Sequence, residues 1–305
     1  MKIVVLGAGA IGSLFGAFLS RNNSVVLVGR TRQKTAIRKQ GLTISGKTNL
    51  RLQLSVEDSV HDVTIQPDLI ILTVKSYDTK QAMDDVRSLI TPSTLVLSLQ
   101  NGLGNLETIE QVVNKEHVFG GVTTHGAFLV RPGVVQHTGL GWTVLGGLQK
   151  GNTAHLRRLV TVFNVAGVTT RVSTDFQKEV WKKAIINSCI NPVTAVFSCK
   201  NGYLLQNPIL SHVVNTICCE STLVARSQGV SVTVPTMIRM TNQVIRETAE
   251  NYSSMVQSIR QGKKTEIDAI TGVIVRIGAQ RQIETPLNTV LLSLITSGII
   301  KKEYY

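Results

Sequence analysis

The feature that most constrains the fold of this chain is the glycine-rich stretch "IVVLGAGAIG" at residues 3–12. It places Gly7, Gly9 and Gly12 between a β-branched apolar segment and a helical one. A second candidate strand, "SVVLVG", follows at the distance expected in a β-α-β unit. Glycines at this spacing allow a tight turn, close approach of the backbone to a pyrophosphate, and close packing of helix on strand. We therefore predict a dinucleotide site, and a glycine-rich turn without a ligand is the weaker alternative.

Strand and helix patterns alternate through the first 172 residues. The candidate strands are 2–6, 24–29, 68–74, 94–99, 117–123, 134–137 and 143–146. The candidate helices lie near 10–22, 79–90, 103–113 and 153–165. Such alternation predicts an α/β fold, a doubly wound Rossmann-type parallel sheet with helices on both faces. The Pro-Gly turn in "RPGVVQHTGLGW" predicts an antiparallel hairpin added to that sheet.

Long helical patterns replace this alternation in the second part of the chain. They cover 174–197, 207–228, 235–261, 264–281 and 286–300. Prolines near the starts of three of them fit the first helical turn, where a missing N–H costs little. We predict two domains: a dinucleotide-binding Rossmann domain over 1–172, and an all-helical domain for substrate binding and catalysis over 173–305.

The end of the second strand bears on the choice of cofactor. An NAD enzyme usually has an acid there that holds the ribose 2′-hydroxyl. This chain reads "VGRTRQK", with Arg30 and Arg32 and no acid within that stretch. A guanidinium attracts a 2′-phosphate and can bind two of its oxygens, so we expect NADP(H). The alternative is that Arg30 is an ordinary surface residue.

Two later strand ends carry polar residues. Lys75 follows the strand in "DLIILTVKSYD", and Asn101 follows the strand in "LVLSLQNG". Ligands of open α/β sheets lie beyond the carboxyl ends of the strands. Each residue alone has an ordinary interpretation, a solvated lysine or an Asn-Gly turn. Together they favour one ligand site at this edge.

Composition excludes several classes of function. The 305 residues are 43% hydrophobic and 17% charged, as in a folded soluble protein, and no apolar run is long enough to cross a bilayer. We therefore expect no membrane association and a cytoplasmic location. The formal charge of +13 is spread along the chain without basic runs or interleaved aromatics, which argues against nucleic acid. The four cysteines form no CxxC pair and the six histidines are scattered, so we expect inert thiols and no metal site.

The stretch "WKKAIINSCINPVTAVF" (residues 181–197) places three polar residues on one side of an apolar helix. Lys183, Asn187 and Asn191 are four residues apart, so each lies about 40° from the last around the helix. Pro192 should kink or end the helix nearby. Lys183 could instead extend to solvent and the two amides could be core residues with backbone partners. Three long polar groups are costly to bury unless satisfied together, which favours a ligand site.

A second polar cluster lies in "ENYSSMVQSIRQGKKTEIDAITG". Asn251, Ser253 and Ser254 precede Glu266 by one helical stretch. Taken alone, Glu266 is best interpreted as an acid in the first turn of a helix, and the Asn and Ser residues as helix caps.

Taken in order, several segments make the chain resemble the ketopantoate reductase (2-dehydropantoate 2-reductase) family over essentially its whole length. The segments are "GAGAIG", the lysine in "VKSYDT", "QNGLGN", "GVTTHGA", "WKKAIINSCINPVTA", "KNG", "AENYSSMVQ" and "KKTEID". The resemblance implies a Rossmann domain and a helical domain with the active site in the cleft between them. One departure is Ser258, where many members are expected to have aspartate.

The resemblance also implies roles for single residues. Lys183 would give a proton to the ketone oxygen, with Glu266 as a second catalytic residue that contacts substrate or cofactor. The implied substrate-binding residues are Lys183, Asn187, Asn191, Asn201, Asn251 and Ser254. The implied cofactor-binding residues are Gly7, Ala8, Gly9, Ala10, Ile11, Gly12, Arg30, Lys75, Asn101, Ala127 and Glu266.

The activity implied by this resemblance is NADPH-dependent reduction of 2-dehydropantoate to (R)-pantoate, a step in pantothenate and coenzyme A biosynthesis. One alternative is a reductase of another small 2-keto acid on the same fold. Another is a non-catalytic NADP(H)-binding sensor, and a nucleic-acid binder is a distant fourth. The expected partner is a small-molecule substrate, and a homodimer is one assembly that the sequence allows.

Overall fold

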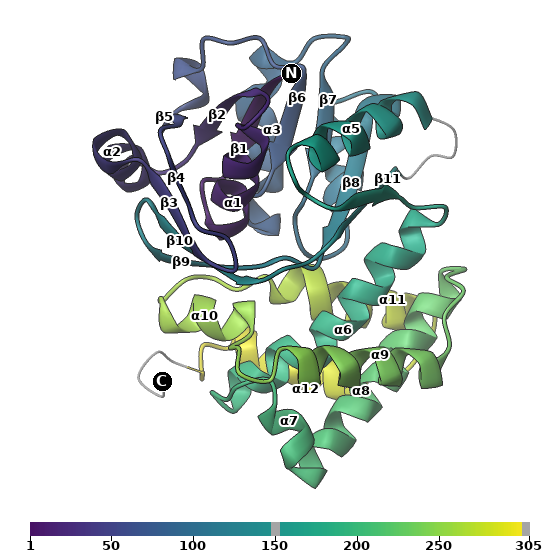
Figure 1. The fold of residues 1–305 in the computed structure, drawn as a ribbon. Helices are drawn as coiled ribbons and strands as arrows, with labels where there is room; N and C mark the ends of the chain where they lie inside the picture. The colour runs from purple at the N-terminus through teal and green to yellow at the C-terminus, as the bar shows by residue number, and fades with distance from the viewer. Residues whose placement is uncertain (148–152, 301–305) are drawn as a thin grey trace. The chain divides into compact units, whose positions relative to one another are not determined.

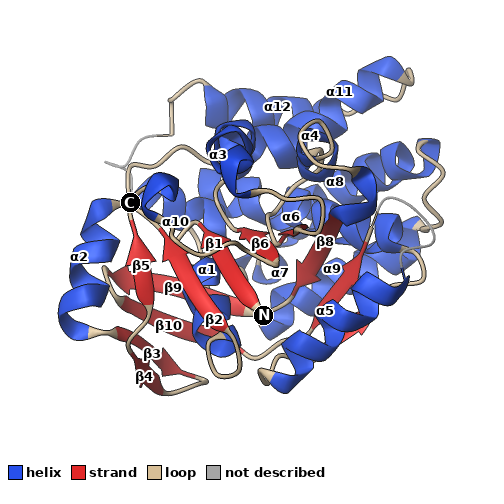
Figure 2. Cartoon of the chain, turned by 90° about the horizontal axis from the view of Figure 1, so that it is seen from above, coloured by secondary structure: helices blue, strands red, loops and turns tan. Residues whose placement is uncertain are grey.

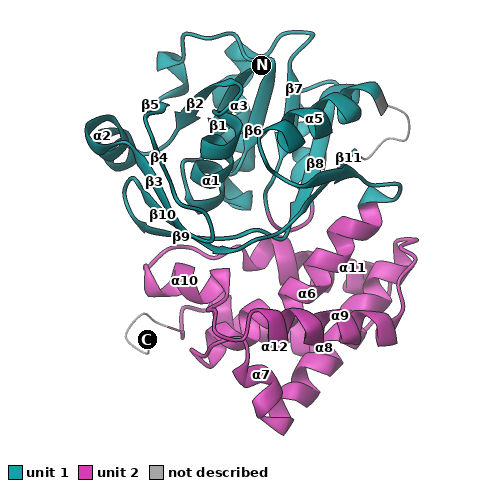
Figure 3. Ribbon diagram, in the orientation of Figure 1, with its two compact units in different colours: residues 1–100, 104–176 teal, residues 101–103, 177–305 magenta. Residues whose placement is uncertain are grey.

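The structure, a computed structural model, describes residues 1–147 and 153–300 (Figure 1). The chain folds into two compact units (Figure 3). Unit 1 comprises residues 1–100 and 104–176, and unit 2 comprises residues 101–103 and 177–305. The short segment 101–103 therefore belongs with the helical unit, although it follows a strand of unit 1 in the chain.

Unit 1 contains a large, mostly parallel sheet. Its strands are β1 (Lys2–Leu6), β2 (Ser24–Val28), β5 (Ser55–Glu57), β6 (Leu69–Leu72), β7 (Leu95–Ser98), β8 (Val118–Thr123), β11 (Thr143–Gly146) and β12 (Thr170–Val172). Their spatial order is β12-β11-β8-β7-β6-β1-β2-β5, parallel from β5 to β8 and antiparallel between β8 and β11. From β5 to β8 this is the 3-2-1-4-5-6 order of dinucleotide-binding folds, which reverses between β1 and β6.

Helices follow the strands of unit 1. They are α1 (Ala10–Leu19), α2 (Thr31–Gln40), α3 (Thr79–Val86), α4 (Asn105–Ile109) and α5 (Thr153–Val165), with 3-10 turns η1 (Val60–Asp62), η2 (Ser76–Asp78), η3 (Arg87–Leu89) and η4 (Lys115–His117). The central strands β6 and β7 are buried along their whole length. Strands buried on both faces read as continuous apolar runs, which is why the sequence revealed them clearly.

A second, four-stranded sheet lies on the far side of α1. Its strands are β3 (Leu42–Gly46), β4 (Leu50–Leu52), β9 (Gly126–Arg131) and β10 (Val134–Gly139). Their order is β4-β3-β10-β9, and Figure 2 shows them as a layer separate from the large sheet. Phe15 of α1 belongs to one apolar core with Ile3 of β1 and Ile44 and Val135 of the second sheet.

This second sheet corrects one prediction. The Pro-Gly turn does join an antiparallel hairpin, β9 with β10, but the hairpin pairs with β3 and not with the large sheet. β11, which follows it, is the strand that pairs with β8. A turn motif specifies the hairpin locally, whereas the partner of its outer edge depends on a segment about 90 residues earlier in the chain.

Unit 2 is helical. Its helices are α6 (Phe176–Val196, which begins at the last residue of unit 1), α7 (Tyr203–Gln206), α8 (Pro208–Ser227), α9 (Val234–Glu247), α10 (Ser254–Arg260), the π-helical turn η5 (Asp268–Gly272), α11 (Val273–Gln280) and α12 (Pro286–Thr296). Pro208, Pro235 and Pro286 lie in first turns, as predicted. The core includes Trp181 and Ile185 of α6.

One helix prediction in unit 2 was wrong, and one of two alternatives at Pro192 is excluded. The single helix predicted over 235–261 is two helices, α9 and α10, separated by residues 248–253. Pro192 does not end α6, which continues to Val196. It removes the N–H that would bond the Ser188 carbonyl, and the next turn is supported by the Thr194 hydroxyl, 2.8 Å from the Ile190 carbonyl oxygen.

The fold class is confirmed: a Rossmann-type parallel sheet is followed by an all-helical part. The elements that the sequence did not indicate are short or weakly amphipathic. In α2, for example, only Gln33 and Ile37 are buried, so the segment carries almost no helical apolar pattern. Within residues 1–147 and 153–300, no helix has both the length and the apolar character needed to cross a bilayer.

Candidate active site

The glycine turn of unit 1 is held by backbone hydrogen bonds from the neighbouring strand. The N–H groups of Gly7 and Ala8 both donate to the Val28 carbonyl oxygen, at 2.8 and 3.0 Å. Gly7 has a φ of +104°, which only glycine adopts at little cost. The Thr73 hydroxyl, at the end of β6, donates to the Gly7 carbonyl oxygen at 2.7 Å. Three adjacent strands thus fix this turn, at the point where the strand order reverses.

The turn leaves room on one side and none on the other. A Cβ atom added at Gly9 would meet nothing within 4 Å, whereas one added at Gly12 would collide with the carbonyl oxygen of Gly7. Gly9 is the N-cap of α1, and no side chain caps the helix. Free N–H groups beside an open position suit a pyrophosphate, so the turn fits a dinucleotide.

A buried glutamine ties the start of α2 to this turn. The side-chain amide of Gln33 donates to the Ala8 carbonyl oxygen and accepts a hydrogen bond from the Gly133 N–H at 2.7 Å. Sequence reasoning missed Gln33. The available signal was its position four residues before Ile37, on the buried side of an otherwise polar helix. Arg30 is the N-cap of α2 and is exposed, as is Arg32. Neither guanidinium has an ion pair in the described part of the chain.

Lys75 lies at the end of β6, next to the glycine turn. It is the N-cap of η2 and is partly buried. The Gln100 amide, after β7, donates to the Val74 carbonyl oxygen at 3.0 Å and to the Thr79 hydroxyl at 2.8 Å. Gln100 therefore fixes the loop that carries Lys75. The sequence indicated the lysine but not the glutamine that holds its loop.

Ala127, the remaining cofactor candidate of unit 1, lies in β9 of the second sheet. Close to it, His125 Nδ1 is 3.0 Å from His137 Nε2, and both rings contact Phe18 of α1. Burial, with a smaller contribution from His137, lowers the pKa of His125 to about 4. The His125 ring is therefore neutral at physiological pH. Its Nε2 is buried without a hydrogen-bond partner.

In unit 2, the predicted stripe lies along α6. Lys183 and Asn187 are partly buried, and Asn191 is buried. Burial lowers the pKa of the Lys183 ammonium from 10.5 to about 8, and the Glu266 carboxylate acts in the opposite direction. A lysine with this pKa is still mostly protonated at pH 7 and can release its proton readily.

Glu266 comes just before the helical run that begins at Ile267, and it is buried. Its carbonyl oxygen accepts a hydrogen bond from Ala269, whose own carbonyl oxygen accepts one from Leu103 at 2.8 Å. The segment that carries Asn101 is therefore bonded to the turn that follows Glu266. Glu266 is not simply a solvated acid in the first turn of a helix, because it is buried and interacts with Lys183.

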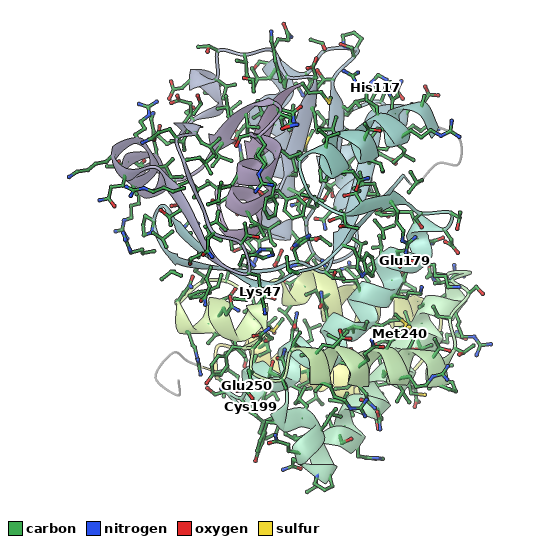
Figure 4. The ribbon with its side chains drawn as sticks, in the orientation of Figure 1. Lys47, His117, Glu179, Cys199, Met240 and Glu250 are labelled. Atoms are coloured by element: carbon green, nitrogen blue, oxygen red, sulfur yellow. The ribbon has the colours of Figure 1, made fainter. Side chains whose placement is uncertain are left out.

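Asn201 and Asn251 are bonded to each other although they lie far apart in the chain. The Asn201 N–H donates to the Asn251 carbonyl oxygen at 3.0 Å, and the Asn201 amide donates to the Thr248 hydroxyl at 2.9 Å. Figure 4 labels Cys199 and Glu250, which flank this junction. Asn201 Oδ1 is buried and has no hydrogen-bond partner. It is an acceptor that a ligand hydroxyl could satisfy.

A hydroxyl pair joins this junction to α6. The Thr194 hydroxyl is 2.8 Å from that of Ser253, which caps α10. Ser253 is thus a cap, as its residue type indicated. Ser254, the first residue of α10, is exposed. Because α9 and α10 are separate helices, Asn251 lies in the connector between them and Ser254 is the first residue of α10.

The structure therefore gathers the predicted residues into two groups. In unit 1, the glycine turn, Arg30 and Lys75 lie at the carboxyl ends of adjacent parallel strands, and Ala127 lies in the second sheet. In unit 2, Lys183 interacts with Glu266, and Asn201 is bonded to Asn251. The first group suits a nucleotide and the second a small polar molecule.

Comparison with known proteins agrees with this division. The family model described as "Ketopantoate reductase PanE/ApbA" matches residues 3–150, and its C-terminal counterpart matches residues 175–298. A 2-dehydropantoate 2-reductase of Pyrococcus horikoshii is 40% identical over 296 residues, which cover 97% of this chain and 96% of that protein.

Two solved structures have the same fold. A ketopantoate reductase of Ralstonia eutropha is 30% identical with a TM-score of 0.89, and the match covers 99% of each chain. D-mandelate dehydrogenase, in a ternary structure with NADH and anilino(oxo)acetate, is also 30% identical, with a TM-score of 0.92 and coverage of 97% of this chain and 98% of that one. The glycine turn, the Lys183 stripe and these matches over nearly the whole length together lead to one conclusion: the chain belongs to the ketopantoate reductase family.

Proposed function

We propose that the protein reduces 2-dehydropantoate to (R)-pantoate with NADPH, in pantothenate and coenzyme A biosynthesis. The observation that carries the proposal is the interaction of Lys183 with Glu266. Lys183 lies on α6, which also carries the amides of Asn187 and Asn191. The interaction occurs in a chain 40% identical to a named 2-dehydropantoate 2-reductase. The nucleotide role is assigned to residues 1–172 and the substrate role to residues 173–305.

Lys183 is proposed as the proton donor. Reduction of a ketone makes an alkoxide, and an ammonium stabilises the developing negative charge before it transfers a proton to the oxygen. A pKa of about 8 keeps Lys183 mostly protonated at neutral pH while making it a stronger acid than a free lysine. The Glu266 carboxylate favours the charged form, and so maintains the population of Lys183 that can donate.

The residues of unit 1 fit a dinucleotide, and a reduced nicotinamide, when bound, supplies the hydride for the keto carbon. The N–H groups after Gly9 would hold the pyrophosphate, since a Cβ-free position there leaves space. Arg30 would bind a 2′-phosphate, and its lack of an ion pair within the described residues leaves the guanidinium available. Lys75 and Ala127 of unit 1 would make further contacts along the cofactor, and so would Asn101, although it belongs to unit 2.

The amides of unit 2 would hold the substrate. Asn187 and Asn191 lie on the Lys183 side of α6, and Asn201 presents a buried oxygen without a partner. Such an oxygen suits the hydroxyl of 2-dehydropantoate, because it can only accept. Asn251 and Ser254 are proposed to bind its remaining polar groups. Holding the substrate in one orientation is itself a large part of the rate enhancement.

A second candidate follows from the D-mandelate dehydrogenase match. That protein is bound to NADH, and its fold agrees with this chain at a TM-score of 0.92. A reductase of a different 2-keto acid, using NADH, would need the same glycine turn and the same lysine. The two candidates differ in the side chain of the substrate and in the 2′ group of the cofactor.

The test is the loss of NADPH absorbance with 2-dehydropantoate, compared with phenylglyoxylate (the keto acid of mandelate), pyruvate and 2-oxoisovalerate, each repeated with NADH. We expect the highest kcat/KM with 2-dehydropantoate and NADPH. A higher value with phenylglyoxylate and NADH would favour the second candidate. Binding of NADPH without turnover of any keto acid would contradict both and favour a nucleotide sensor.

A further inference from the structure

Charged side chains of both signs lie around the start of α2, on α2 itself, on the last residue of β5 and on the segment that follows it. Glu57 is the last residue of β5, which pairs with β2, and its carbonyl oxygen accepts a hydrogen bond from the Gly29 N–H at 2.9 Å. Asp58 follows it, and hydrogen bonds from Lys34 and then from Thr31, the first residue of α2, lower the Asp58 pKa. Glu57 and Asp58 therefore contact Gly29 and Thr31, the two chain neighbours of Arg30, where the 2′ group of a cofactor is proposed to lie.

Lys34 occupies the centre of this acidic group. Its Nζ is 2.7 Å from Asp58 Oδ1, 3.0 Å from Glu57 Oε2 and 3.8 Å from Asp62 Oδ2. Arg38 Nη2 is 2.7 and 2.8 Å from the two Glu57 oxygens. The three acids would otherwise meet the spacing of a cation site, and the lysine ammonium takes that place. The Lys34 and Glu57 side chains are each only 18% exposed.

We propose that Lys34 is a specificity-determining residue of the nucleotide site, because it neutralises Asp58 and Glu57 and so allows Arg30 and Arg32 to hold a 2′-phosphate. The inference rests on the proposed preference for NADPH. Lys34 does not itself need to touch the cofactor. It acts through the carboxylates that it binds.

The charge balance supports this role. The positive residues are Arg30, Arg32, Lys34 and Arg38, and the negative ones are Glu57, Asp58 and Asp62, which leaves a net charge of +1. Without Lys34 the net charge is zero, and Asp58 is no longer neutralised. An acid at this position repels a phosphate and suits the ribose hydroxyl of NAD. Lys34 Nζ lies 2.7–3.8 Å from an oxygen of each acid, which is short compared with the screening length of about 8 Å at physiological salt.

The first experiment is calorimetric titration with adenosine 2′,5′-bisphosphate and with adenosine 5′-monophosphate, which differ only in the 2′-phosphate. Wild type should bind the bisphosphate more tightly. Lys34→Gln should lower the affinity for the bisphosphate by about tenfold or more and leave the affinity for the monophosphate nearly unchanged. Lys80→Gln is the matched control, because Lys80 forms an exposed pair with Asp84 on α3 in the same unit. The Lys80→Gln variant should bind both ligands with wild-type affinity.

A second variant keeps the inference testable if Lys34→Gln folds poorly. Asp58→Asn removes a carboxylate while Lys34 stays, so it should bind the bisphosphate more tightly than the wild type does. The double variant Lys34→Gln/Asp58→Asn should regain part of the preference for the bisphosphate that Lys34→Gln loses. Equal weakening of both ligands by Lys34→Gln, or an effect equal to that of Lys80→Gln, would overturn the inference.

Ligand binding separates this inference from the proposed function. A wild type that binds both fragments with equal affinity contradicts the NADPH preference and the role of Lys34 together. A wild type that prefers the bisphosphate while Lys34→Gln keeps the full preference contradicts the role of Lys34 alone. Preference with loss in Lys34→Gln supports the inference even if the enzyme fails to reduce 2-dehydropantoate.

Discussion

The glycine turn of unit 1 and the Lys183 stripe of unit 2 are built in different ways. The first uses backbone groups of a short contiguous turn, Gly7 to Gly12, whose shape depends on missing side chains. The second uses side chains of α6, and its Lys183 interacts with Glu266 from a segment much further along the chain. A site formed by backbone groups is encoded by one short sequence motif, whereas a site formed by side chains requires the packing of segments that are distant in the chain. Damage to the two should therefore differ in kind.

The largest effect is expected from Lys183→Ala. It should lower kcat by about 10³-fold, within the range typical of general acids, while the affinity for NADP(H) stays within about twofold because unit 1 is untouched. The measurements are steady-state kinetics and a cofactor titration. Lys182→Ala is the control, since Lys182 pairs with Glu179 on the same helix. A comparable loss in the control would mean that α6 itself had been disturbed.

Each unit contains a group whose pKa is lowered by burial, His125 in unit 1 and Lys183 in unit 2. We expect protonation of Lys183 to affect the reaction rate and protonation of His125 to affect the stability of the fold. The pKa of His125 is about 4 in the fold and 6.5 when unfolded. The unfolded chain therefore binds the proton first as the pH falls. The stability from neutral His125 is complete above pH 6.5 and is lost between pH 6.5 and 4, by up to about 3 kcal/mol.

Urea unfolding between about pH 7 and pH 4 measures this loss, with His125→Asn as the comparison. The variant should lose less stability over that interval than the wild type does. Equal pH dependence of the two proteins would show that His125 does not remain neutral in the fold.

Two alanine substitutions separate the shape of the glycine turn from its ligand. Gly12→Ala places a Cβ against the Gly7 carbonyl and should destabilise the protein by about 1–3 kcal/mol, since the turn must shift. Gly9→Ala meets open space, so its melting temperature should be close to that of the wild type while NADP(H) binds more weakly. Thermal unfolding with and without cofactor checks both. Normal cofactor affinity in Gly9→Ala would argue that no pyrophosphate lies there.

The smallest of the four effects is a change in pH dependence. Glu266 raises the Lys183 pKa, so Glu266→Gln should lower it below about 8. A proton donor works only when protonated, and the decline in kcat at high pH should therefore move to lower pH. A shift of about one pH unit corresponds to about tenfold less activity on the alkaline side. A decline that stays in place, or moves upward, would mean that Glu266 does not act through Lys183.

The predictions that held were those based on local patterns. β6 and β7 are apolar throughout because both faces are covered, and α6 shows its stripe because helical periodicity is local. The break between α9 and α10 was not visible, because Asn251 is held by Asn201 from another part of the chain. The hairpin of β9 and β10 was visible, but its partner β3 was not.

The sequence by itself determined the fold class, the glycine turn and the residue types available for chemistry, since these depend on neighbours in the chain. Only the tertiary structure decided which charges are neutralised and how far a pKa is shifted. The acids beside Arg30 are neutralised by Lys34, and the pKa of Lys183 reflects burial opposed by Glu266. Electrostatic energies depend on distance and on exclusion of water, and both are established only when residues far apart in the chain meet.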